Sequence, residues 1–115
     1  MLERSGGGHF YANVEVNGEL IRFIIDTGAT GVSLTERDAE RVGIALNPGS
    51  YTQVGMGAGG PVHGQVVRLD RVSLDGKEVR GLTGMVPQGS DMHLLGQEYL
   101  NQFSVEMRGG TMRIY

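Results

Sequence analysis

An aspartate ends an apolar stretch early in the chain. Residues 23–31 read FIIDTGATG, so three apolar residues lead into Asp26 and small, turn-forming residues follow it. An ionised carboxylate in apolar surroundings loses its hydration unless a partner replaces it. An aspartate at the end of a buried strand is therefore costly, and we expect it to have a use. It can take part in chemistry, or it can be a turn carboxylate that caps its own backbone.

The chemistry open to this aspartate depends on a second acid. Hydrolysis of an amide without a metal, serine or cysteine needs a base to activate water and an acid to protonate the product. Two aspartates close together can do both, because like charges resist ionising together and the pair shares one proton. The sequence contains a single Asp-Thr-Gly motif. Catalysis would therefore need Asp26 from a second chain, most simply across a two-fold axis.

Composition argues against several other kinds of site. The 115-residue chain has a formal net charge of -3 and no basic run, which disfavours nucleic acid as a partner. It has no cysteine, so thiolate catalysis and disulfides are excluded. His9, His63 and His93 lack the paired spacing of metal ligands, and we expect no metal or other cofactor. No apolar run approaches the roughly 20 residues that span a bilayer, so we expect a soluble segment without membrane contact.

The chain is long enough for one domain. Its first eight residues, MLERSGGG, are typical of a flexible N-terminal segment or a junction, and we expect the domain to occupy residues 9–115. Twenty glycines without a regular period predict many tight turns between short strands, and therefore a mostly β fold. Apolar alternation and turn residues predict strands at residues 10–16, 19–25, 32–34, 51–56, 65–74, 77–86, 94–95, 103–107 and from 112 to the end.

Turn and capping residues position these strands and two short helices. Asn17-Gly18 and Asp75-Gly76 predict two-residue hairpins, because both central residues of a type I′ turn need positive φ. Thr35 is typical of a helix N-cap, which predicts a helix at residues 36–42. Gly96 allows a sharp change of direction into a second short helix that runs through Gln102.

The order of three motifs adds a family resemblance. FIIDTGA, then the glycine-rich GMGAGGPVHG, then LLGQEYL resemble the retropepsin-like (retroviral-type) aspartic proteases, particularly bacterial single-domain members of about this length. The resemblance covers roughly residues 9–115. It implies a closed β-barrel-like monomer with one or two short helices, acting as a C2 homodimer. It also implies an aspartic endopeptidase that cleaves extended peptides, in a periplasmic or membrane-anchored setting in the full-length protein.

The resemblance assigns roles to three groups of residues. Asp26 of each subunit would form the catalytic dyad. The catalytic loop would be supported by Thr27, Gly28, Leu94, Leu95 and Gly96. Peptide would be bound by Ala29 and Thr30 and by a flap, a mobile hairpin that excludes water, made of Met56, Gly57, Ala58, Gly59 and Gly60. A shared proton further predicts a bell-shaped pH profile of activity on the acidic side of neutrality.

The sequence departs from this family at two places and leaves alternatives. The flap has no aromatic residue, and Gln97-Glu98 stands where retroviral enzymes carry an arginine. We expect Glu98 to be solvated. The glycine-rich stretch could instead be a plain surface loop, whereas a phosphate cradle is disfavoured because strand, not helix, follows it. The alternative function is a non-catalytic dimerisation or peptide-binding module with the same fold.

Overall fold

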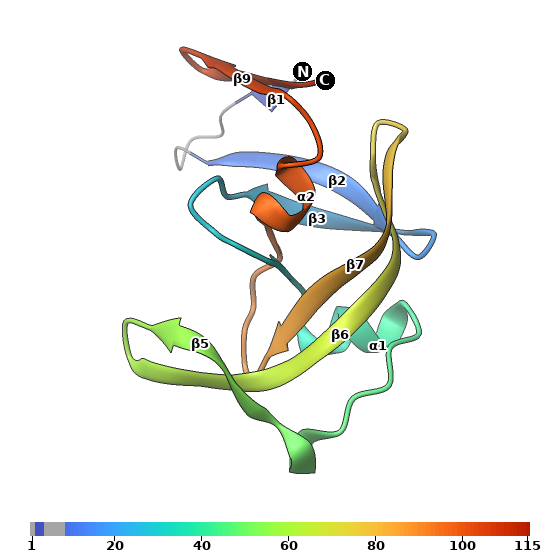
Figure 1. Ribbon diagram of the computed structural model, residues 1–115, viewed down its shortest axis with the longest axis vertical. Coiled ribbons are helices and arrows are strands. Elements are labelled where there is room, and N and C mark those ends of the chain that lie inside the picture. The colour runs from blue at the N-terminus through green and yellow to red at the C-terminus, as the bar shows by residue number, and fades with distance from the viewer. Residues whose placement is uncertain (1, 4–8) are drawn as a thin grey trace.

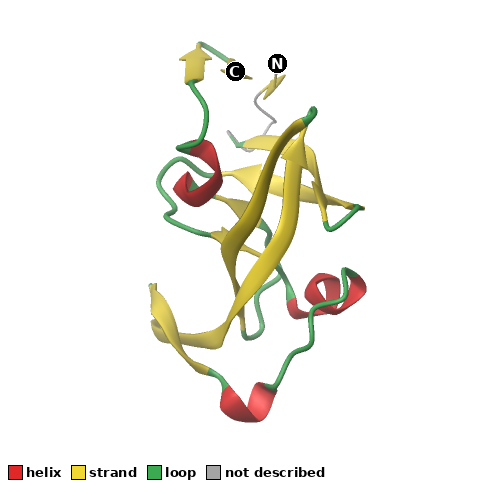
Figure 2. Ribbon diagram, turned by 45° about the vertical axis from the view of Figure 1, so that its right-hand side comes forward, coloured by secondary structure: helices red, strands yellow, loops and turns green. Residues whose placement is uncertain are grey.

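The computed structural model describes residues 2–3 and 9–115. Its helices are α1 (Glu36–Arg41) and α2 (Gln97–Leu100), with a 3-10 turn, η1 (Pro48–Ser50). Its strands are β1 (Leu2–Glu3), β2 (Phe10–Val16), β3 (Glu19–Ile25), β4 (Val32–Ser33), β5 (Thr52–Gly57), β6 (Gly60–Leu74), β7 (Lys77–Pro87), β8 (Leu94–Leu95), β9 (Val105–Arg108) and β10 (Thr111–Ile114). The mostly β prediction is confirmed, and Figure 2 shows how little of the described chain is helical.

The main sheet almost closes on itself. Its strand order is β2-β3-β8-β4-β7-β6-β5, and an additional pairing of β2 with β6 joins the two sides into a near-closed ring (Figure 1). Strand β8 lies between β3 and β4, parallel to the first and antiparallel to the second. A segment from the last third of the chain is thereby placed directly beside the loop that joins β3 to β4.

Both predicted two-residue hairpins are present. Asn17 and Gly18 have φ of 51° and 90°, and Asp75 and Gly76 have φ of 50° and 77°. These are the left-handed conformations that a type I′ turn requires. The turns fix the register of β2 with β3 and of β6 with β7. The apolar residues that alternate along these strands therefore all face the same interior.

The first helix is capped as predicted, and the second is shorter. The Thr35 hydroxyl accepts the Asp38 N–H at 3.2 Å. Helix α1 ends at Arg41, and Gly43 follows the C-cap residue Val42 with φ of 89°. Helix α2 ends at Leu100 rather than Gln102. Its buried residues, Tyr99 and Leu100, cover one opening of the ring, and the Tyr99 hydroxyl donates to the Lys77 carbonyl at 2.6 Å.

The glycine-rich stretch forms more strand than predicted. Strand β6 begins at Gly60, whereas we expected residue 65. Antiparallel pairing with β5, joined by β7 from Gly64 onward, overrides the low strand propensity of glycine here. Gly64 fits because it has no side chain, since a Cβ there would overlap the Val86 carbonyl of β7.

The core fills the ring with aliphatic and aromatic side chains. Its largest fully buried members are Tyr99, Phe23, Leu34, Leu69, Leu95, Leu100, Met112, Val14, Val16, Val32, Val72 and Val86. The hairpin strands contribute one face each, as in the alternating buried and exposed residues of β2. Side chains thus fill the interior of the ring, and the candidate site lies at its rim.

A second, smaller sheet joins the two ends of the described chain. Its order is β1-β10-β9, with Leu2 opposite Met112 and Glu3 opposite Thr111. The N-terminal segment that we expected to lie outside the fold therefore contributes a two-residue strand. The rest of that segment, residues 1 and 4–8, lies outside the described residues. No helix in the described part of the chain is long and apolar enough to cross a membrane.

Candidate active site

Asp26 lies just beyond the last residue of β3, at the start of the loop that β8 braces. Its backbone N–H donates to the Leu95 carbonyl at 3.0 Å, which continues the parallel pairing of Ile25 with Leu95. Leu95 is fully buried, whereas Asp26 is only half-buried. The aspartate therefore emerges from the core on a backbone held from one side by β3 and from the other by β8.

The Asp26 carboxylate contacts its own loop through one oxygen. Oδ1 accepts the Gly28 N–H at 3.0 Å, and the Asp26 carbonyl accepts the Ala29 N–H at 3.1 Å. This is the turn-capping contact that the simpler interpretation predicts. No donor among the described residues contacts Oδ2, so one oxygen orients the side chain and the other is left without a hydrogen-bond donor. Turn capping and catalysis are compatible in this geometry.

Gly96 permits the closest contact beneath the loop. A Cβ at Gly96 would lie 2.5 Å from the Ala29 carbonyl oxygen and would overlap the Gly31 carbonyl. Because the side chain is absent, the first backbone N–H groups of α2 reach the loop. Gln97 N–H donates to the Ala29 carbonyl at 2.9 Å, and Glu98 N–H donates to the Thr30 carbonyl at 2.8 Å. The predicted support residues and the Asp26 loop are thus brought together.

Gln97 is a second brace that sequence reasoning left unassigned. Its side-chain Nε2 donates to the Thr27 carbonyl at 2.8 Å, two residues before the carbonyl that its backbone N–H contacts. The loop is therefore held at Thr27 and at Ala29 by one residue. The signal in the sequence was the position of Gln97 directly after Leu-Leu-Gly, where the resemblance placed a bracing arginine.

His93 fixes the strand that carries this loop. Its carbonyl accepts the Ile24 N–H at 2.8 Å, and its ring lies 5.5 Å from the Phe23 ring. Its Nε2 lies 2.9 Å from Asp38 Oδ2 and 3.1 Å from the Thr35 hydroxyl, which ties β8 to α1. Burial lowers the pKa of His93 below its ordinary value, although the Asp38 carboxylate acts in the opposite direction.

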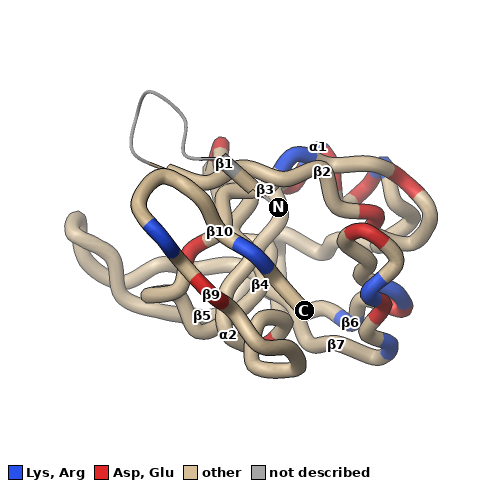
Figure 3. Tube along the Cα trace, turned by 90° about the horizontal axis from the view of Figure 1, so that it is seen from above, with Lys and Arg blue, Asp and Glu red and all other residues tan. Residues whose placement is uncertain are grey.

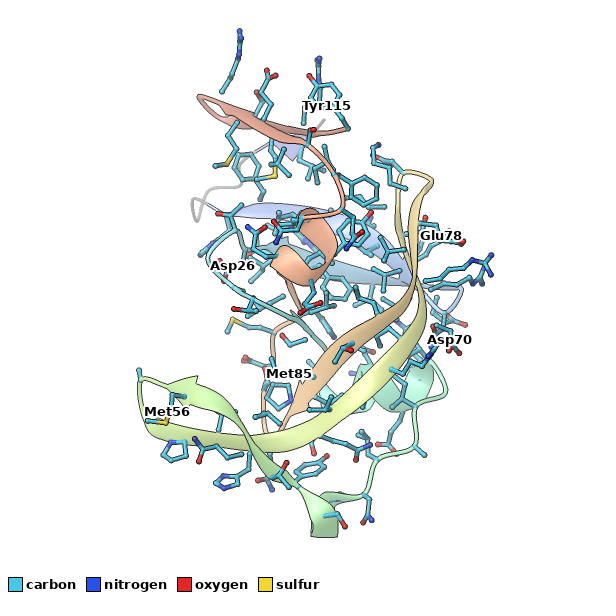
Figure 4. The ribbon with its side chains drawn as sticks, viewed as in Figure 1. Asp26, Met56, Asp70, Glu78, Met85 and Tyr115 are labelled. Carbon is cyan, nitrogen blue, oxygen red and sulfur yellow. The ribbon has the colours of Figure 1, made fainter. Side chains whose placement is uncertain are left out.

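The predicted flap residues form a projecting hairpin. Strands β5 and β6 pair up to Gly57 with Gly60, and Ala58 and Gly59 form the turn. Met56 is 72% exposed. In Figure 4, Asp26, Met85 and Met56 lie along one side of the molecule. No hydrogen bond within the described residues joins the hairpin tip to the Asp26 loop, so the structure sets the two groups on one side without bringing them into contact.

Glu36 anchors the base of this hairpin. Its carboxylate accepts the Tyr51 hydroxyl at 2.7 Å and the Gly89 N–H at 2.9 Å. The Gly89 N–H and, next, the Tyr51 hydroxyl lower the pKa of Glu36, and the carboxylate raises the pKa of Tyr51 to about 12. The residue that enters β5 is thereby fixed to α1, while the tip beyond it is free of such contacts.

A pocket of about 290 Å³ opens between the Asp26 loop and the hairpin. Its walls come from the loop, from β5, β6 and β7, and from α2, and they are Thr30, Gly31, Val54, Val66, Thr83, Met85 and Glu98. Only Thr30 of these was predicted to contact a ligand. The others were not predicted as ligand contacts, because long-range strand pairing brings them together. The described residues hold no group of three or more His, Cys, Asp or Glu side chains that could bind a metal ion.

The chain has the retropepsin-like fold of aspartic proteases, with a near-closed sheet ring, an aspartate loop braced by β8 and a projecting hairpin. The chain belongs to the family described as gag-polyprotein putative aspartyl protease, whose model matches residues 12–102. The predicted family and fold are confirmed.

Two solved structures and one curated relative are similar to this chain. A retropepsin-like aspartic protease from Rickettsia conorii has 31% sequence identity and a TM-score of 0.85, over 98% of this chain and 86% of that one. A Rickettsia prowazekii protein is 38% identical over 104 residues, which cover 90% of this chain and 45% of the relative. EIAV protease in complex with an inhibitor has 20% identity and a TM-score of 0.65, over 80% of this chain and 85% of that one, which shows the fold alone. The chain spans about half the length of the curated relatives that it matches.

Proposed function

We propose that the chain is an aspartic endopeptidase that acts as a homodimer, with Asp26 of each subunit forming the dyad. The observation that carries the proposal is a half-buried aspartate at a strand end, held on both sides by backbone hydrogen bonds and facing the side from which a hairpin projects. Family membership supports a peptidase. The single Asp-Thr-Gly motif requires the second acid to come from another subunit.

The proposed reaction uses one proton shared by the two carboxyl groups. The ionised carboxylate takes a proton from water, whose oxygen attacks the scissile carbonyl carbon, while the protonated carboxyl gives its proton to the carbonyl oxygen. The resulting tetrahedral diol then collapses. Its C–N bond breaks as the amide nitrogen accepts the proton of one carboxyl group, while a hydroxyl of the diol gives its proton to the other carboxylate. The products are an amine and a carboxylic acid, and the pair is again singly protonated. Activity therefore needs one protonated carboxyl per dimer, with a bell-shaped pH profile on the acidic side of neutrality.

The remaining site residues would position the substrate and the loops. The Thr27 hydroxyl would cross the two-fold axis to the partner backbone, and Gly28 would let the peptide approach closely. Ala29 and Thr30 would offer backbone groups to an extended peptide. The hairpin tip, Met56–Gly60, would close over the peptide and exclude water.

Asp26→Asn tests this proposal. It preserves size and the turn-capping acceptor but removes the proton exchange of the dyad. We expect kcat for a peptide library to fall by about 10³-fold or more, with the dimer intact by analytical ultracentrifugation. Asp70→Asn is the matched control, because Asp70 is exposed and lies on the opposite side of the molecule (Figure 4). Equal turnover by wild type and Asp26→Asn would remove the dyad from the proposal.

The non-catalytic module makes a different prediction in the same experiment. It predicts that neither wild type nor Asp26→Asn cleaves any peptide across the acidic range, while the dimer or peptide binding persists. A pepstatin-type inhibitor added to the wild-type reaction separates the dyad from a contaminating protease of another class, because that inhibitor acts on paired aspartates.

A further inference from the structure

The pocket beside the Asp26 loop has a mostly apolar wall. Val66 of β6 lies directly opposite Met85 of β7, and Thr83 follows on the same face of β7 because alternate residues of a strand share a face. Val66 is 58% exposed, so much of its side chain is accessible to a ligand at this surface. These side chains form a surface that an aliphatic group of a bound peptide can cover.

A β-bulge turns one more apolar side chain into this pocket. The pairing of β5 with β6 shifts between Gln53 and Gly55, so Val54 has no partner across the ladder. A bulged residue is re-aimed relative to its neighbours. Val54 is only partly exposed and lines the pocket, while the residues around it on β5 are exposed. The hairpin base therefore contributes a wall of the pocket.

Glu98 supplies the only charge among the residues that line the pocket. Its backbone N–H donates to the Thr30 carbonyl, which fixes its Cα beside the Asp26 loop. Within the described residues, its carboxylate has no ion-pair or hydrogen-bond partner. It also borders a neighbouring polar pocket with Gln97, Asn101 and Gln102, so the carboxylate stands at the rim, where water reaches it.

The surroundings do not neutralise this carboxylate. No residue from Val42 to Val67 is Asp, Glu, Lys or Arg, and the hairpin formed by β5 and the start of β6 carries no charge colour in Figure 3. The next residue on the face of β6 that carries Val66 is Arg68. Its guanidinium lies near Gly81 and 3.7 Å from Asp70. The pocket thus combines an apolar wall with a single unpaired anion.

We propose that this pocket selects a lysine or arginine side chain of the peptide substrate. The aliphatic stem covers Val54, Val66 and Met85, and the cationic end meets Glu98 at the rim, as long basic side chains do when they cover apolar surface and keep the charge in water. Glu98 is then a specificity-determining residue, and the substrates are peptides with a basic residue near the cleaved bond. This inference rests on the proposed peptidase function.

The test uses octapeptides with blocked ends. In each peptide set one position is lysine, norleucine or glutamate, and the other positions hold mixtures of amino acids. Norleucine keeps the stem of lysine without its charge. Binding is measured by fluorescence anisotropy on Asp26→Asn protein, so that it does not depend on turnover, and cleavage is measured on wild type by mass spectrometry. We expect lysine to be favoured over norleucine about fivefold at one position, because the ion pair is partly hydrated, and less so as salt rises.

Variants of Glu98 make the test specific. Glu98→Gln should remove the preference for lysine, and Glu98→Lys should replace it with a preference for glutamate. Glu15→Gln is the matched control, since it removes the same charge from the exposed face of β2, near the Asn17-Gly18 turn. Retention of the lysine preference in Glu98→Gln, equal binding of lysine and norleucine peptides at every position, or no peptide binding at all would overturn the inference. Selective binding without any cleavage by wild type would leave it standing and overturn the proposed catalysis instead.

Discussion

The Asp26 loop and the β5–β6 hairpin are both rich in glycine, yet glycine has a different role in each region. Beneath the loop, Gly96 lets backbones approach to a distance that no Cβ allows. In the hairpin, Gly55, Gly59 and Gly60 have open space where a Cβ would stand. The loop is held by hydrogen bonds from β8 and α2, whereas among the described residues the hairpin tip is hydrogen-bonded through its own ladder alone. Close packing makes one region rigid, and the absence of packing leaves the other free to move.

The largest expected effect comes from closing the space beneath the loop. Gly96→Ala should lower the free energy of unfolding by about 3 kcal/mol, because a methyl group forced between the Ala29 and Gly31 carbonyls must displace backbone. The backbone itself is not strained by the change, since Gly96 has φ of -102°. Urea unfolding measures the loss. A loss below about 1 kcal/mol would show that the loop adapts and would weaken the contrast with the hairpin.

A smaller effect should follow from removing one brace of the loop. Gln97→Ala deletes the hydrogen bond to the Thr27 carbonyl, which is worth about 1 kcal/mol of stability. If the loop positions the dyad, kcat should fall about tenfold with little change in KM, because misplacement affects the reacting groups more than peptide binding. Gln102→Ala, an exposed residue just beyond α2, is the control. Unchanged kcat in Gln97→Ala would limit this residue to stability.

Acid should loosen the loop region before it affects the hairpin. Burial lowers the pKa of His93 below 6.5, so the unfolded chain binds the proton more readily than the folded one. This contribution to stability is full above pH 6.5 and is lost as pH falls from there toward the lowered folded value. The fall in Tm from about pH 7.5 to about pH 5 should therefore be smaller in His93→Gln than in wild type.

The matched control for this pH effect is His63→Gln, because His63 is exposed on the hairpin strand β6. It should retain the full pH dependence of wild type. The protection factor of the Ile24 amide, whose N–H donates to the His93 carbonyl, should fall at the lower pH in wild type once the slower intrinsic exchange is divided out. An identical fall in Tm for His93→Gln and wild type would contradict the assignment.

The smallest effect on stability is expected at the hairpin turn. Gly59→Ala meets nothing within 4 Å and replaces no left-handed residue, so the free energy of unfolding should change by less than about 0.5 kcal/mol. The same chemical change at Gly96 and Gly59 thus compares the two regions directly. A loss at Gly59 comparable to that at Gly96 would mean that the hairpin tip is packed after all.

Local signals predicted most of the fold because they act between neighbouring residues. Positive φ at Asn17-Gly18 and Asp75-Gly76 set the hairpins, and the Thr35 cap set α1. The early start of β6 at Gly60 was not predictable from propensity, because these residues are in a strand through their pairing with β5. The pairing of Leu2–Glu3 with β10 was not predicted either, because it also depends on a partner strand far away in the sequence.

The candidate site also contains residues that local sequence signals predicted and residues that they did not. Asp26 and the residues that follow it were identifiable because chemistry and turn residues lie next to each other in the sequence. The second brace at Gln97 and the pocket carboxylate at Glu98 were not, since both act on a loop about 70 residues earlier, which they meet only through the insertion of β8 between β3 and β4. The roles of the site residues stay predictions.

The small sheet at the chain ends has a consequence for how this molecule meets its neighbours. Within the part of the chain that the structure describes, Leu2 and Glu3 alone cover one edge of β10, through two opposed residue pairs. A strand so short is displaced at little cost, and its departure would bare a row of amide and carbonyl groups ready to accept another extended segment. Removal of the first few residues should therefore expose the edge of β10 to strand pairing with another chain. Self-association is the first effect to measure.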